Sequence, residues 1–531
     1  MSRRPWATAA AGALLLVGCS SGRGDDGGPA GAPSSDAGAT AGHEAVDLQA
    51  VDLPSVTGAR FPIYSADGER ILFSGIPAGG TRVEVMSVAE DGSDLRCLSC
   101  EAAAGSDAAL LKPIPFPDGA RVAVRVGEQT PLRPADHAVL ECTPSLTDCQ
   151  AAELVPIAPP AAGDDAVVQD EREVRIAPDG ETVAFSQIRR RADGDNAIVA
   201  VVGRLRRADD GTTYEVDDPR AVSTLGELKS FTPDGQAVLV AAFTTLPERA
   251  ANPDIVRVDL ATGEEEAVTV DGDYDEDISL SPDQDWYVVA SGRGAGLFET
   301  VSQVRRPNFI GPGLEPLTAY LFAHHRRELL EPWLVRVGAE QNGDRGQQLN
   351  PRSLDDGFDA RTLMTWHPTG DRILFWEGQS DPFGPPTAAS RIVVAHLTDR
   401  HPADREPASP SPDAVWAPPL AGFVPPPLPA QPSRRGEVSG TATVTRRAGP
   451  EPAQTVTEVR YDRFSDDGEW VIDGTESTTH DNGLLGATTY TADLALSGTH
   501  HGSLRADATI SAGGIEGAIE SNVDGRPLHL P

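Results

Sequence analysis

The sequence predicts an all-β protein: a six-bladed β-propeller followed by a small antiparallel β domain, either a sandwich or a roll. Three observations support this prediction. One tight-turn motif occurs six times, a run rich in β-branched and aromatic residues follows each copy, and the repeat shows no helical periodicity. A period near 50 residues with this pattern is typical of propellers, in which each repeat forms one four-stranded blade.

The recurring motif is a turn of the form Pro-Asp-Gly. Proline sets φ to about −65°, the aspartate accepts hydrogen bonds from the next amides, and glycine takes a positive φ. Together they form a short hairpin turn. The turn positions are Asp67, Asp118, Asp179, Asp234, Asp283 and Thr369. Gln284 replaces the glycine of the fifth copy and Thr369 replaces the aspartate of the sixth, so we expect looser turns there.

The intervals between turn positions set the number of blades. The first four intervals are 51, 61, 55 and 49 residues, and the last is 86 residues. We interpret the long interval as an insertion in blade five, around residues 304–350, because no further turn of this type occurs inside it. Its stretch 314–330 can be a helix on the propeller face or a pair of long strands. The alternative is a degenerate seventh blade.

A propeller ring must close, and the start of the folded chain offers a strand for this purpose. Glu44–Leu53 (EAVDLQAVDL) alternates polar and apolar residues, as an outer strand does. We expect this segment to pair with Arg391–Leu397 (RIVVAHL) and complete the last blade. Residues 44–400 are therefore assigned to the propeller.

Residues 1–19 have the pattern of an export signal, with a basic start and an apolar run too short to span a bilayer. The residues LVGC at its end resemble the bacterial lipobox, in which the cysteine, here Cys19, receives a lipid. The alternative is an ordinary secretory signal. Residues 20–43 contain almost no large apolar side chain and are expected to be a disordered tether. These features predict an exported lipoprotein anchored to the outer or the cytoplasmic membrane.

Four further cysteines are Cys97, Cys100, Cys142 and Cys149. Export to an oxidising compartment favours disulfides, and four cysteines allow three pairings. Cys142 can face Cys149 across a hairpin, whereas Cys97 and Cys100 need a local bend to pair. Zinc binding by all four cysteines is the alternative.

The segments YSADGE, APDGET, TPDGQA and SPDQDW resemble the TolB-like, WD-repeat-like propeller family, over roughly residues 47–398. That resemblance implies that the strand before each turn lines a central channel. It also implies that the propeller serves as an interaction platform, and it names no partner.

The remainder of the chain follows a change in composition. Residues 401–435 are rich in proline and are predicted to be a semi-rigid linker. In residues 436–531, short alternating segments between glycine-containing turns indicate the antiparallel β domain. The stretch 464–470 (FSDDGEW) resembles a seventh propeller turn, but it follows the linker, so we assign it to this domain.

Several functional classes find no support in the sequence. The formal net charge of −36 argues against a nucleic-acid partner, whose phosphates favour basic surfaces. The chain also lacks a G-x-S-x-G elbow, a phosphate-binding loop, a dinucleotide fingerprint and an H-E-x-x-H motif.

One acidic run is a candidate metal site. DGDYDED places Asp271, Asp273, Asp275 and Asp277 at alternating positions, and calcium binds six to eight oxygen atoms. The run does not match the EF-hand pattern, and a solvated loop is the alternative. Calcium is thus the one possible cofactor.

Two other acidic runs occupy the corresponding place in blades three and six. If the ring closes as predicted, these acids gather at one mouth of the channel and attract a cation or a basic segment. The expected mouth residues are Asp170, Glu171, Glu173, Asp355, Asp356, Asp359 and His367. Propeller lyases that act on acidic sugars carry channel histidines and a metal, which is why His367 is included.

The sequence thus favours a non-catalytic lipoprotein of the cell envelope whose propeller binds a protein or peptide. The alternative is a metal-assisted extracytoplasmic hydrolase or lyase that acts at the channel mouth. A third possibility is a spacer whose C-terminal domain recognises the partner.

Overall fold

The computed structural model describes most of the chain from residue 44 onward. The described ranges are 44–102, 108–127, 136–160, 167–192, 196–243, 250, 253–310, 314–325, 327–350, 357–379, 389–403, 408–427, 433–451, 454–481 and 486–530. Cys19 and both N-terminal segments predicted above lie outside these ranges. Among the described residues, no helix combines the length and the apolar character needed to cross a lipid bilayer.

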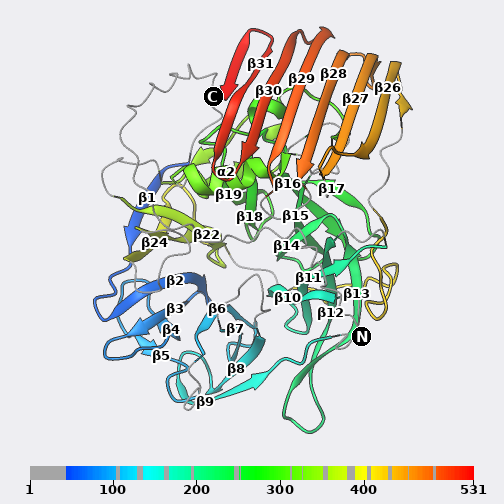
Figure 1. The fold of residues 1–531 in the computed structure, drawn as a ribbon. Coiled ribbons are helices and arrows are strands. Elements are labelled where there is room, and N and C mark those ends of the chain that lie inside the picture. Colours follow the sequence, from blue (N-terminus) through cyan, green and yellow to red (C-terminus); the bar gives the residue numbers. More distant parts are fainter. Residues whose placement is uncertain are drawn as a thin grey trace, which may run out of the picture.

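Six antiparallel sheets of four strands each form the blades of a propeller (Figure 1). Blades one to three contain β2 (Val56–Tyr64), β3 (Ile71–Pro77), β4 (Glu84–Val88), β5 (Arg96–Cys97); β6 (Leu110–Pro115), β7 (Arg121–Val126), β8 (Asp136–Pro144), β9 (Cys149–Pro156); and β10 (Val167–Ile176), β11 (Thr182–Arg190), β12 (Asn196–Arg207), β13 (Tyr214–Ser223). Blades four to six contain β14 (Gly226–Phe231), β15 (Ala237–Phe243), β16 (Pro253–Asp259), β17 (Glu265–Ala267); β18 (Asp275–Leu280), β19 (Trp286–Ser291), β20 (Glu331–Arg336), β21 (Gln347–Gln348); and β22 (Asp359–Trp366), β23 (Arg372–Gly378), β24 (Ser390–Leu397) and β1 (Val46–Ala50).

The first strand of each blade lies nearest the axis, because these strands contact one another around the ring: β2 with β6, β6 with β10, β10 with β14, β14 with β18, β18 with β22, and β22 with β2. The ring closes as predicted. Strand β1 pairs antiparallel with β24, with Val46 opposite Leu397 and Ala50 opposite Val393. The sixth blade therefore combines strands from both ends of the propeller segment, and the count is six blades.

The six recurring turns lie at one end of the propeller, which we call the turn end, and there they contact one another. A side chain placed on Gly180 would lie 2.8 Å from Pro117 of the preceding turn, and one on Gly370 would lie 3.5 Å from Pro282. Where the preceding turn has Ala66 in place of proline, the space beside Gly119 is open. Gly180 also has a φ of +73°, which only glycine adopts readily. In blades three, four and six the glycine of the turn thus faces the proline of the turn before it.

The opposite end, which we call the loop end, carries the insertion of blade five. It runs between Ser291 and Glu331, and contains α1 (Glu299–Ser302) and α2 (Pro316–His324). The helix option for the stretch 314–330 is therefore the one adopted. The expected limits, 304–350, are shifted, because residues after Glu331 already form the third and fourth strands of the blade.

The C-terminal domain is one eight-stranded antiparallel sheet, not the expected sandwich or roll. Its strands follow the chain order: β25 (Arg434–Arg435), β26 (Ser439–Ala448), β27 (Gln454–Ser465), β28 (Trp470–Asp481), β29 (Thr488–Gly498), β30 (Gly502–Ser511), β31 (Gly514–Val523) and β32 (Arg526–Leu530). In β29 every second residue is buried. The covering layer comes from the propeller, since α1 contacts β31 and α2 contacts β30 (Figure 1). The turn 464–470 joins β27 to β28, as assigned.

A buried ion pair fixes the sheet to the insertion. Arg306, which follows α1, donates to both carboxylate oxygens of Glu476 in β28, at 2.9 and 2.6 Å. The hydroxyls of Tyr461 and Tyr490 donate to the same carboxylate, at 2.7 and 3.0 Å. All four side chains lie in the interior, so each charge and each hydroxyl depends on the others for its partners.

The proline-rich segment is packed against the propeller over residues 408–427, more closely than a spacer would be. Trp416 donates its indole N–H to the carbonyl of Leu260 at 2.9 Å, and Arg204 pairs with Asp413 at 2.7 Å. Farther along, the amide of Leu420 donates to the carbonyl of Pro219 at 2.7 Å. This segment therefore holds blades three and four together.

Candidate functional site

The inner strands share an irregularity that turns charged side chains toward the axis. Four of them carry a residue with positive φ six positions before the turn residue: Phe61, Lys112, Glu173 and Leu363, with φ between 48° and 54°. All six inner strands have a register shift of the β-bulge type against their neighbour. Bulges re-aim side chains, and this one recurs at nearly the same height in the channel.

Blades two to five meet near the axis in a group of eight charged side chains, which we call the axial cluster: Lys112, Arg172, Glu173, Arg175, Glu227, Lys229, Glu276 and Asp277. Lys112 binds Glu173 at 2.7 Å, and Arg175 binds Glu173 at 2.9 Å. Lys229 binds Glu227 at 2.7 Å and Glu276 at 2.5 Å. The side chains are at most 19% exposed, so the cluster is largely withdrawn from solvent.

One contact shows that the cluster lies across the channel. Arg175 belongs to blade three and Asp277 to blade five, and they approach to 3.9 Å although blade four stands between them in the ring. Such an approach requires side chains that project over the axis. Ion-paired groups therefore extend over the axis at this height.

The predicted excess of negative charge at the channel mouth is wrong for the residues that can be placed. Glu173 and Asp277 do reach the axis, but Lys112, Arg175 and Lys229 bind or face them there. The cluster has four acids and four bases. Sequence reasoning considered the acids of these strands and not the bases beside them.

The pKa values of the axial-cluster side chains depend on burial and on the neighbouring charges. Burial disfavours the charged form of Lys229, but Glu227, Glu276 and Asp277 together raise its pKa well above the usual value. Burial likewise disfavours ionised Glu173, yet Lys112, Arg175 and Lys229 hold its pKa well below the usual range. For Glu276 burial prevails and raises the pKa to about 7, against the opposing effect of Lys229. Glu276 therefore titrates near neutral pH.

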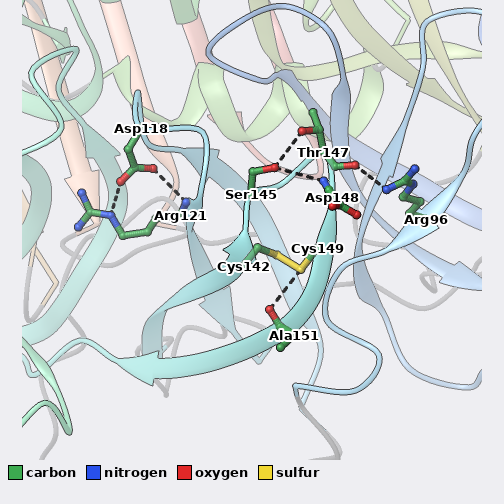
Figure 2. The surroundings of a disulfide bond; sticks show 9 residues. All are labelled: Arg96, Asp118, Arg121, Cys142, Ser145, Thr147, Asp148, Cys149 and Ala151. Atoms are coloured by element: carbon green, nitrogen blue, oxygen red, sulfur yellow. Dashed lines mark hydrogen bonds and ion pairs between the residues drawn. A yellow bond between two sulfur atoms is a disulfide. The ribbon is translucent and has the colours of Figure 1, made fainter.

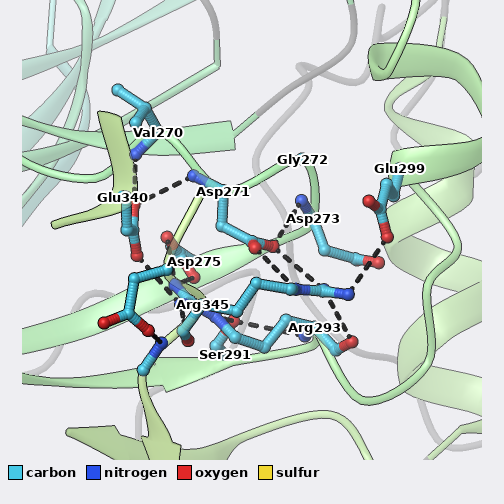
Figure 3. Close-up of polar contacts among 12 residues, drawn as sticks. Val270, Asp271, Gly272, Asp273, Asp275, Ser291, Arg293, Glu299, Glu340 and Arg345 are labelled. Carbon is cyan, nitrogen blue, oxygen red and sulfur yellow. Dashed lines mark hydrogen bonds and ion pairs between the residues drawn. The ribbon is translucent and has the colours of Figure 1, made fainter. Parts of the chain in front are cut away.

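The four aspartates proposed as calcium ligands are not brought together. Asp275 is bound by Arg293 at 3.0 and 3.1 Å, and Asp271 is bound by Arg345 at 2.9 Å (Figure 3). Asp277 belongs to the axial cluster. Arg293 and Arg345 further bind Glu340 and Glu299, at 2.9 and 3.2 Å. No group of three potential ligands that could hold a metal ion occurs in the described ranges. The run is buried and not a solvated loop, and it forms an ion-pair network that joins blade five to its insertion.

Asp273 completes this network as a buried carboxyl. Its Oδ1 accepts a hydrogen bond from the amide of Tyr274 at 2.9 Å. Burial raises its pKa well above the usual value, and the neighbouring carboxylates of Asp271 and Glu299 act in the same direction. Burial and these neighbours therefore favour the protonated form of Asp273.

His367 does not belong with the acids, because it follows the last residue of β22 at the turn end. Its Nε2 lies 3.2 Å from the carbonyl oxygen of Gly68, in the turn of blade one, and its ring stands edge-on to that of Tyr64 at 4.7 Å. His367 therefore joins the sixth blade to the first. The predicted grouping of His367 with the channel-mouth acids is wrong, since Asp359 begins the same strand at the other end.

The remaining predicted mouth residues are placed only in part. Asp359 lies 3.8 Å from Arg361 in its own strand. For Asp170 and Glu171 the structure describes the backbone, in β10, and not the side chains. Asp355 and Asp356 lie outside the described residues.

The four cysteines pair within their own segments. Cys142 and Cys149 form a disulfide across the hairpin of β8 and β9 (Figure 2). Cys97 and Cys100 form the other, where the chain bends after β5. Disulfides are confirmed, zinc is not needed to explain the cysteines, and both bonds are consistent with an extracytoplasmic protein.

Comparisons with known proteins concern the fold. No family model and no curated protein matches the chain. Among solved structures it is similar to a TolB from Agrobacterium tumefaciens (16% identity, 57% of this chain, 84% of that chain, TM-score 0.33) and to TolB from Acinetobacter baumannii (15%, 62%, 64%, 0.32). The chain folds as a six-bladed propeller, which is the fold that the resemblance to TolB-like propellers implies. Oligogalacturonate lyase from Vibrio parahaemolyticus is similar to the same low degree (12% identity, 67% of this chain, 98% of that chain, TM-score 0.31), so the likeness assigns no activity.

Proposed function

We propose that the chain is a non-catalytic lipoprotein of the cell envelope, anchored through a lipid on Cys19, whose propeller binds a protein or peptide at its loop end. The observation that carries this proposal is the axial cluster, in which four blades present fixed charges of both signs. Its more exposed members, Lys112 and Glu276 at 17% and 19%, are held in place by their ion pairs, so a polar group that meets them finds charges already oriented.

The structural roles of the residues proposed for chemistry also favour binding over catalysis. His367 connects two blades, and Asp271 and Asp275 are held by arginines in an interior network. A hydrolase or lyase built on these residues would have to break contacts that hold the fold together.

Capture of crosslinked neighbours from intact cells tests the proposal, with Cys19→Ala as the control. We expect the native chain to fractionate with membranes and to be crosslinked to a defined neighbour. The Cys19→Ala chain should be released from the membrane and lose that neighbour. A Cys19→Ala chain with the same location and the same neighbour would contradict the anchored platform.

A further inference from the structure

A small hollow lies beside the axial cluster, between blade two and the inner strand of blade three. Its lining residues are Lys112, Ile114, Ala123, Val124, Arg125, His137, Glu173 and Val174. Its space is about 310 Å³ when the open solvent at its mouth is counted, and its enclosed part is far smaller, with room for one small polar group such as a carboxylate. The walls are apolar, and four ionisable side chains face one another between them.

The charges of this hollow differ in sign from those of the protein. Among the described residues that line it, Lys112 and Arg125 are basic and Glu173 is the one acid, so basic groups outnumber acidic ones here in a chain of net charge −36. The pKa of Lys112 is lowered by burial; Glu173 opposes this shift, while Arg125 and Arg175 add to it. The cations are therefore crowded, and a further anion would relieve their repulsion.

Lys112 has hydrogen-bonding capacity to spare. An ammonium group has three donors. In the part of the chain that the structure describes, the acceptor bound to it is Glu173, at 2.7 Å, and its side chain is 17% exposed. Two N–H groups of a mostly buried ammonium are thus available beside a hollow.

The choice of lysine over arginine at position 112 is the next observation. The chain has 44 lysine and arginine residues, of which only Lys112 and Lys229 are lysines, and both belong to the axial cluster. Lysine offers a compact charge with three rotatable donors, whereas arginine presents a rigid planar fork. A compact charge suits a confined site in which the ligand adds to an existing carboxylate.

We infer that this hollow is a carboxylate-binding site, in which Lys112 and Arg125 bind the anion between the apolar side chains of Ile114 and Val174. The inference rests on the proposed function in one respect: the carboxylate would belong to a peptide, as a C-terminus or an acidic side chain. A free small carboxylic acid has the same chemistry. This partner is opposite in charge to the basic one that the acidic runs of the sequence suggest.

Calorimetric titration of the purified chain with succinate, and with one short peptide in free-acid and C-terminally amidated forms, tests the inference. We expect saturable binding of succinate that weakens as salt is added. Lys112→Met should weaken it about tenfold or more, since a hydrogen bond to a charged group is lost. Lys112→Arg should restore part of the affinity.

Glu173→Gln gives the sharpest contrast, because it removes the one competing carboxylate and should tighten succinate binding. The charge-balanced double variant Lys112→Met/Glu173→Gln controls for folding, with its melting temperature as the check; it should fold and bind weakly. Absence of succinate binding, or equal affinities in the native chain and the Lys112→Met variant, would overturn the inference.

The peptide pair separates this inference from the proposed function. A free-acid peptide that binds more tightly than its amide supports a peptide carboxylate. Binding of succinate without that difference overturns the peptide source and leaves a small-acid site. If crosslinking in intact cells captures a defined neighbour but succinate does not bind, the proposed function is supported and the carboxylate-binding site is overturned.

Discussion

The two ends of the propeller differ in how uniform their connections are. At the turn end every first-to-second strand connection is five or six residues long, from Tyr64 to Ile71 in blade one and from Trp366 to Arg372 in blade six. At the loop end the second-to-third strand connections range from five residues, between Arg190 and Asn196, to thirty-nine, between Ser291 and Glu331. The repeated end maintains the ring, and the variable end has the freedom that recognition requires.

The largest expected effect concerns the C-terminal sheet, which packs on the insertion at the loop end. Arg306→Met leaves the carboxylate of Glu476 buried without its cation, so we expect a loss of about 3–5 kcal/mol in the free energy of unfolding of the sheet. Denaturation monitored by circular dichroism, together with limited proteolysis, measures this loss. The sheet should be digested before the propeller.

The double variant Arg306→Met/Glu476→Gln is the control for that experiment. It removes both charges and should recover part of the stability. If the Arg306→Met variant unfolds at the same denaturant concentration as the native chain, this ion pair does not hold the sheet on the insertion.

The turn end offers a matched pair of glycines. Gly119 and Gly180 have φ of +69° and +73°, but only Gly180 faces a proline. We expect Gly119→Ala to lower the free energy of unfolding by about 1–2 kcal/mol, from backbone strain alone. Gly180→Ala should lower it by about 1–3 kcal/mol more, because the new methyl group contacts Pro117. Urea denaturation of the two variants gives the difference. Equal losses would show that the turns do not support one another.

A smaller effect concerns Glu315, before α2 in the insertion. Burial raises its pKa from 4.5 to about 7, so the folded state keeps this proton at a pH where the unfolded chain releases it. Stability from this group is full below pH 4.5, falls as the pH rises to 7, and stays low above. Glu315→Gln should thus stabilise the protein by about 3 kcal/mol at pH 8 and hardly at pH 4. Melting temperatures at both pH values provide the measurement, and a gain of the same size at pH 4 would contradict the assignment.

Much of the fold could be predicted from sequence because one motif repeats. Six turns gave the number of blades, and the alternation of residues 44–53 identified the closing strand. The fold of the C-terminal domain was harder to predict, because the layer that covers its sheet is an insertion more than a hundred residues earlier in the chain. Periodicity shows that Tyr490 is buried, but it does not show that α1 and α2 cover that face.

The site could be predicted less well, because bulges decide which side chains reach the axis. Asp275 and Asp277 are two positions apart, yet one is bound by Arg293 and the other lies in the axial cluster. A signal was nevertheless present. When the copies are aligned on their turn residues, Lys112, Glu173 and Asp277 all occupy the sixth position before the turn. Comparing the copies by column would have revealed the bases as well as the acids.

We propose that the partner binds at the loop end and not at the turn end. Thr81 and Glu69 test it within one blade, since both are exposed and lie at opposite ends of β3. A photo-crosslinking amino acid introduced at either position in intact cells should give a defined adduct from position 81 and none from position 69. An adduct from position 69 with none from position 81 would contradict the claim.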